Sequence, residues 1–178
     1  DFTGVEKPSG SDNAIYDIRY SSGNVNNYSL AEVEMIDLNG DGLPDRVMTD
    51  PNDDENWKVQ FNNGSSFETM TNWGNIDDPN PGVGSDQYKI RSVTDSNYTV
   101  TDLADVNADG RPDRILWKSG TTWKVQLNNG TSFDDMRSFP GIENPTSLDN
   151  YKYIRCSDNN GSIGVDLIDL DGDGLVDR

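Results

Sequence analysis

The chain has 178 residues, of which 32 are acidic and 14 are basic, so its formal net charge is −18. This charge excludes a nucleic-acid partner, because phosphate backbones are held by clusters of Lys and Arg, and no apolar run approaches the ~20 residues that span a bilayer. With no histidine and with Cys156 as its single cysteine, the chain also lacks the usual zinc ligands, His-based acid–base catalysis and any internal disulfide.

The predicted elements are β-strands, because Trp, Tyr, Val and Ile recur in short alternating patches between turn residues. A strand ending at Ile36 leads into an acidic loop, and a second strand starts at Arg46. The next strand, Trp57-Lys-Val-Gln-Phe-Asn-Asn-Gly64, puts Trp57, Val59 and Phe61 on one face. Its Asn63-Gly64 pair predicts a tight type I′ turn, which needs two positive φ values.

The same series of elements returns further along the chain. Trp123-Lys-Val-Gln-Leu-Asn-Asn-Gly130 nearly repeats the hairpin sequence, and the acidic loops begin 68 and then 64 residues apart. Such periodicity indicates a repeat architecture. We expect three units: 1–72, which lacks its first residues, 73–138, and 139–178, which is truncated after its loop.

Each acidic loop has the donor spacing of a calcium site. Calcium takes six to eight oxygen ligands, which a short loop can supply from alternate side chains and one backbone carbonyl, with a glycine at the sharp turn. The predicted ligands are Asp37, Asn39, Asp41, the carbonyl of Leu43 and Asp45 in the first loop; Asp105, Asn107, Asp109, the carbonyl of Arg111 and Asp113 in the second; and Asp169, Asp171, Asp173, the carbonyl of Leu175 and Asp177 in the third.

Two other interpretations of the loops are weaker. Asx turns use the same residues without metal, but three or four carboxylates gathered in one loop would repel one another unless a cation lay between them. Magnesium prefers stricter octahedral geometry, and an EF-hand needs a helix after its loop, whereas β-type sequence follows here. The sequence therefore predicts about three Ca²⁺ ions.

The loop Asp-Leu-Asn-Gly-Asp-Gly-Leu-Pro-Asp-Arg46, followed by the hairpin ending at Gly64, resembles FG-GAP/VCBS repeats. These are the repeats of integrin-α-type β-propellers, and similar ones occur in bacterial surface proteins, toxin-complex components and some lectins. The resemblance implies an all-β, propeller-like fold in which each repeat is a four-stranded blade, with the calcium loop joining its first two strands. A closed propeller needs at least four blades, so we expect these two and a half to belong to a larger array or an open stack.

Other recurring residues have a structural and a functional interpretation. Five Asn-x-Ser/Thr triplets are candidate glycosylation sites, although Asn-rich turns produce such triplets without glycans: Asn27, Asn63, Asn97, Asn129 and Asn160. For the arginine after each loop we expect a structural role: Arg46, Arg114 and Arg178. For the tryptophans we expect core positions: Trp57, Trp73, Trp117 and Trp123. We assign no catalysis to the acids that precede each loop: Glu34, Asp102 and Asp166.

The expected function is a non-enzymatic calcium-binding β-repeat module of an extracellular or cell-surface protein, serving adhesion, binding or scaffolding. Its expected partners are neighbouring repeats of the same or identical chains and a protein or carbohydrate ligand. A glycosylated extracellular filament is one alternative. A part of a polysaccharide-acting enzyme is another, for which no nucleophile–base pair can be named.

Overall fold

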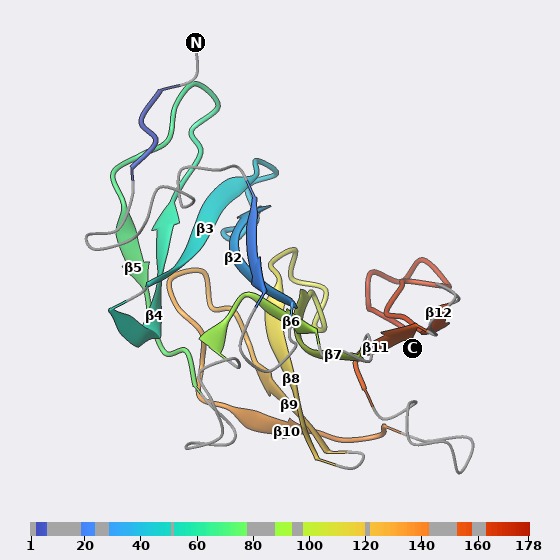
Figure 1. The fold of residues 1–178 in the computed structure, drawn as a ribbon. Helices are drawn as coiled ribbons and strands as arrows, with labels where there is room; N and C mark the ends of the chain where they lie inside the picture. Colours follow the sequence, from blue (N-terminus) through green and yellow to red (C-terminus); the bar gives the residue numbers. More distant parts are fainter. Residues whose placement is uncertain are drawn as a thin grey trace.

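The computed structural model describes residues 3–6, 19–23, 29–50, 52–77, 88–93, 98–119, 122–142, 153–157 and 163–178. Within these ranges the chain is all-β, and its twelve strands pair antiparallel in one strongly curled sheet (Figure 1). No helix among these residues is long and apolar enough to cross a membrane. The strands are β1 Tyr20–Gly23, β2 Ser29–Ile36, β3 Asp45–Asp50, β4 Asp53–Gln60, β5 Thr71–Trp73, β6 Arg91–Val93, β7 Tyr98–Ala104, β8 Asp113–Ser119, β9 Thr122–Gln126, β10 Arg137–Phe139, β11 Arg155–Ser157 and β12 Ile163–Val165.

The strands repeat one plan. β2 to β5 form an antiparallel meander, and β7 to β10 form the same meander in the same order. The registers correspond, since Val47 pairs with Val59 in the first meander and Ile115 pairs with Val125 in the second. This arrangement confirms the predicted all-β, propeller-like repeats. The boundaries at 72 and 138 stay predictions.

A short strand at the start of each later repeat bonds to the repeat before it. β6 pairs with β7 and also with β2, and β11 pairs with β12 and also with β7. Backbone bonds just before these strands continue the link, from Ile90 N to Ala31 O and from Ile154 N to Thr99 O, both 3.2 Å. Neighbouring repeats therefore share one continuous sheet.

The hydrophobic core lies between successive repeats. Phe133, from the hairpin after β9, packs edge-on against Trp57 and Trp73, with ring centroids 5.5 and 6.1 Å away. A second cluster contains Trp123, with Trp117 partly buried against it. The core role predicted for the tryptophans is thus confirmed, and each interface is built from two repeats.

The turn after β4 differs from the predicted type I′ turn. Gly64 has a positive φ of 86°, but Asn63 is not among the residues with positive φ, so the two-residue turn was wrong. The turn is instead closed more widely by a 3.1 Å bond from Asn63 N to Ser66 O. The side chain of Asn63 also accepts the backbone N–H groups of Ser65 and Ser66, which makes it an Asx turn.

Arg46 and Gln60 form a buried hydrogen-bonded pair. The Arg46 guanidinium donates to Glu6 O at 2.7 Å and to the Gln60 side-chain oxygen at 3.1 Å. Arg114 and Gln126 repeat the pair at 2.6 Å. All four side chains are buried, so the structural role predicted for the first two arginines is confirmed.

The acids before each loop form ion pairs with arginines that lie in or just before the short strands β1, β6 and β11. Asp102 is fully buried and lies 2.8 Å from Nε of Arg91 and 2.7 Å from Nε of Arg155. Salt bridges extend this into a ladder that crosses the three repeats: Arg19, Glu34, Arg91, Asp102, Arg155 and Asp166.

Candidate metal-binding loops

Each acidic loop is closed at its base by the same backbone pair. Ile36 pairs with Asp45 between β2 and β3, and Ala104 pairs with Asp113 between β7 and β8. After β12, Ile168 and Asp177 exchange backbone bonds of 3.0 and 2.6 Å. The ninth position is therefore fixed at the neck of every loop.

The first-position aspartate folds back into its loop. In the first loop, Asp37 accepts bonds from the backbone N–H groups of Gly40, Asp41 and Gly42 at 2.8 to 3.0 Å. In the other loops, Gly110 N donates to Asp105 at 2.8 Å, and Gly174 N donates to Asp169 at 3.0 Å. The converging N–H groups hold this carboxylate near the loop centre.

The loops take this shape because their fourth and sixth residues adopt positive φ. Gly40 and Gly42 have φ of 81° and 86°, and the third loop has glycine at both positions with nearly the same values. Glycine tolerates this conformation without steric cost. The second loop has Ala108 at its fourth position, with φ of 59°.

The third and fifth positions are joined by a side-chain bond in the first two loops. Asn39 donates to Asp41 at 3.0 Å, and Asn107 donates to Asp109 at 3.1 Å. The third loop has Asp171 at this position, and a carboxylate cannot donate such a bond. Its third position adds a negative charge instead.

The ninth-position aspartates of the first two loops are fully buried. Asp45 accepts the N–H groups of Leu38 and Asn62 at 3.0 and 2.9 Å. Asp113 accepts two equivalent bonds at 3.0 and 2.8 Å. Asp177 keeps the first of these bonds, at 2.9 Å, and is exposed.

Burial raises the pKa of Asp45 and of Asp113, although their backbone N–H partners oppose the shift and acids of the same loop add to it. An acid whose pKa is raised by folding binds more protons in the folded state. Its contribution to stability therefore falls as pH rises from its ordinary value of 3.8 through the raised folded value. A cation beside the ionised carboxylate would offset this loss.

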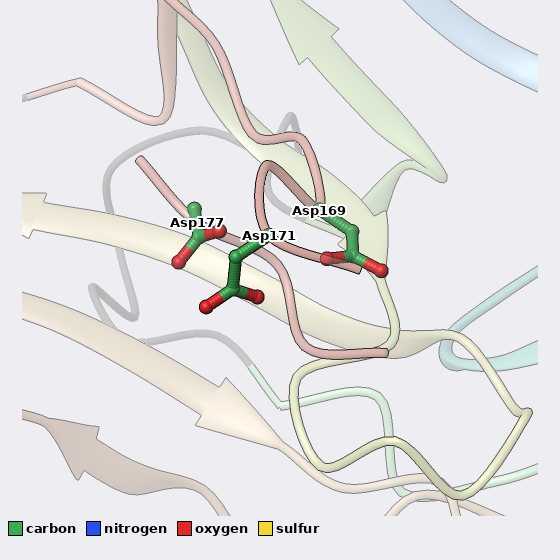
Figure 2. Close-up of side chains that lie close together, drawn as sticks. All are labelled: Asp169, Asp171 and Asp177. Atoms are coloured by element: carbon green, nitrogen blue, oxygen red, sulfur yellow. The ribbon is translucent and has the colours of Figure 1, made fainter. Parts of the chain in front are cut away.

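The third loop brings three carboxylates together, as Figure 2 shows. Oxygen atoms of Asp169, Asp171 and Asp177 all lie within 4.8 Å of one another, and all three residues are exposed. Within the described ranges, this is the one place where three acidic groups lie so close. Asp173 of the predicted set is outside this group, and its carboxylate accepts the N–H of Leu175 at 2.8 Å.

The seventh position is fixed through its own N–H group. Leu43 and Arg111 donate to the fifth-position aspartate of their loops at 2.8 and 2.9 Å, as Leu175 does in the third loop. In addition, the guanidinium of Arg111 lies 2.7 Å from the Asp109 carboxylate. The ligand role of the three seventh-position carbonyl groups stays a prediction.

Sequence reasoning missed the part played by Asn62 and Asn128. Their backbone N–H groups hold the ninth-position aspartates, and the Asn128 side chain also donates to Leu38 O at 2.8 Å, in the loop of the preceding repeat. The recurrence of Asn-Asn-Gly in both hairpins was the available signal.

Two of the five candidate glycosylation sites lie in the described residues. Asn63 and Asn129 are exposed, and each side-chain amide is bonded within its own turn. The Asn129 amide also donates to Asp134 at 2.8 Å. Asn27, Asn97 and Asn160 lie outside the described residues.

Comparison with known proteins supports the fold alone. No protein-family model matches the chain, and a search of curated proteins found no match. Among solved structures, the chain is similar to one of the Photorhabdus luminescens Tc holotoxin pore, with a TM-score of 0.53 and 18% identity. The match covers 97% of this chain and 8% of that one, so the chain spans less than a tenth of its structural neighbour.

Proposed function

We propose that this chain is a calcium-binding β-repeat module of a secreted or cell-surface protein, in which bound ions stabilise the repeats. The module is non-catalytic and serves adhesion, binding or scaffolding. The FG-GAP/VCBS resemblance of its loops and hairpins supports the assignment. The observation on which the proposal depends is the shared geometry of the three loops.

The donor set of the loops fits calcium. Asp37 and Asp45 are held by converging backbone N–H groups, and Asn39 and Asp41 lie bonded to each other between them along the chain. Carboxylate and amide oxygens at such alternate positions are the hard ligands that calcium prefers. The cluster of three carboxylates in the third loop supports the same chemistry.

Burial and charge give the ion a stabilising role. The chain carries a net charge of −18. The carboxylates of Asp45 and Asp113 are buried, and each is held by backbone N–H groups. Filling sites that exist in the folded state adds about 2.7 kcal/mol per site when free calcium is 100 times the dissociation constant. Extracellular calcium reaches concentrations that fill sites of modest affinity, which favours a secreted or surface location.

The experiment is thermal unfolding in calcium and in excess EGTA. We expect chelation to lower the melting temperature by roughly 5–10 °C for each site that was filled at free calcium about 100 times its dissociation constant. Magnesium at the same concentration should restore much less, because it binds such flexible oxygen loops poorly. An unchanged melting temperature in EGTA would overturn the proposal.

A pair of variants separates calcium binding from general charge. Asp169→Asn removes the first-position carboxylate of the third loop, whereas Glu55→Gln removes one exposed carboxylate outside the loops. Calorimetric titration should show weaker binding at one site in Asp169→Asn and unchanged binding in Glu55→Gln. Equal effects in both variants would mean that calcium responds to net charge alone.

A further inference from the structure

The first and second loops lie close together. A side-chain Cβ built on Gly40 would lie 3.0 Å from Cγ of Arg111 and 3.2 Å from the backbone oxygen of Gly110. A side chain at Gly40 would therefore be strained by the positive φ and would also crowd the neighbouring loop. The fourth position of the first loop packs against the sixth and seventh positions of the second.

The second and third loops lie close together at the equivalent positions. A Cβ built on Gly174, the sixth residue of the third loop, would lie 3.4 Å from Cβ of Ala108, the fourth residue of the second loop. The same positions therefore meet at both junctions. Such recurrence shows that loop contact follows from the spacing of the repeats.

These contacts lie beside the expected ligands. Gly40 stands between the expected ligands Asn39 and Asp41. In the second loop, Arg111 carries the expected carbonyl ligand, and Gly110 directly precedes it. The Arg111 side chain, which lies against Gly40, also binds the Asp109 carboxylate at 2.7 Å. The Arg111 side chain therefore links the Asp109 carboxylate to the segment of the first loop around Gly40.

We propose that the three loops bind calcium as one coupled unit, in which an ion in one loop raises the affinity of the loop beside it. This inference rests on the proposed calcium binding. An ion orders the ligand segment of its own loop, and the contact then restricts the neighbouring segment, which loses less conformational entropy when it binds. The coupling is reciprocal, because each ion changes the affinity for the other by the same factor.

The test follows each loop separately during calcium titration. The backbone amides of Gly42, Gly110 and Gly174 give one ¹⁵N NMR reporter for each loop, at the equivalent sixth position. A double variant, Asp105→Asn with Asp109→Asn, removes two expected ligands from the second loop. We expect the midpoints at Gly42 and Gly174 to move to at least about five-fold higher calcium.

Midpoints at Gly42 and Gly174 that stay at their wild-type values would overturn the coupling while leaving calcium binding intact. If the wild-type chain binds no calcium, the proposed function itself fails, and this result is distinct from three independent sites. Circular dichroism checks that the double variant keeps its strands.

A second variant tests the route through Arg111. Arg111→Ala removes the side chain that joins Asp109 to Gly40, and the second junction, between Ala108 and Gly174, is left in place. In this background, inactivating the second loop should shift the Gly42 midpoint less than two-fold and should still shift the Gly174 midpoint. An undiminished shift at Gly42 would show that Arg111 does not carry the coupling.

Discussion

Ala108 occupies the fourth position of the second loop, where the first and third loops have glycine. Its φ of 59° is a left-handed conformation that costs a residue with a Cβ about 1–2 kcal/mol. The loop accepts this strain because the bonds from its backbone N–H groups to Asp105 require the same turn as in the other loops. The hydrogen bonds to Asp105 therefore outweigh the preference of alanine for a negative φ.

Replacing Ala108 by glycine should stabilise the protein. Relief of the strained φ exceeds the extra conformational entropy of glycine in the unfolded chain, so we expect a gain of about 0.5–1 kcal/mol in the free energy of unfolding. Urea denaturation in EGTA, followed by tryptophan fluorescence, measures it. The reverse change, Gly172→Ala, should cost a similar amount, because φ there is 80° and no atom lies within 4 Å of the added Cβ. A loss of stability in Ala108→Gly would contradict the strain argument.

At the scale of the elements, charged side chains link strands of successive repeats. Asp102 in β7 lies between Arg91 in β6 and Arg155 in β11, so one buried carboxylate joins its own repeat to the next. The carboxylate also accepts a bond of 2.9 Å from Leu103 N. Asp166 holds the corresponding place near β12, where its side chain is 32% exposed and lies 2.7 Å from Arg155.

Asp102→Asn should therefore destabilise the protein more than Asp166→Asn does. We expect a loss of about 2–3 kcal/mol at Asp102, where a charge-assisted hydrogen bond to Arg91 and a close ion pair with Arg155 are weakened in a buried site. At Asp166, solvent screening reduces the expected loss to under about 1 kcal/mol. Urea denaturation of both variants at neutral pH checks this order. Equal losses would show that burial of Asp102 does not strengthen its ion pairs.

At the scale of the whole molecule, stability depends on the interfaces between repeats. Phe133 belongs to the second predicted repeat but fills the core against Trp57 of the first, and it is 1% exposed. Phe67 is its counterpart in the first repeat and is less deeply buried. Repeat proteins gain much of their stability from such nearest-neighbour contacts.

Phe133→Ala should cost about 3–5 kcal/mol, because it leaves a cavity between two tryptophans. It should also broaden thermal unfolding, since the two repeats would no longer melt as one unit. Phe67→Ala is the matched control and should cost less. Differential scanning calorimetry distinguishes the two outcomes, and a single sharp transition in Phe133→Ala with little loss of stability would refute the interface role.

Much of the fold and of the loop geometry was determined by local sequence. Alternation in Trp57, Val59 and Phe61 predicted a strand, and Trp57 and Val59 lie in β4. The glycines at Gly40 and Gly42 permit the turn that folds Asp37 back into its loop. These features depend on residues a few positions apart. Periodicity and spacing therefore predicted the strands and the sharp turn of each loop.

Tertiary structure alone decided which polar groups are buried and which loops meet. Gln60 is fully buried because a segment near Glu6 returns to bind it, and Asp45 is buried because Asn62 closes over it. The contact of Gly40 with Arg111 joins residues far apart in the chain. Such contacts follow from the twist and pairing of the whole sheet, so local sequence cannot specify them.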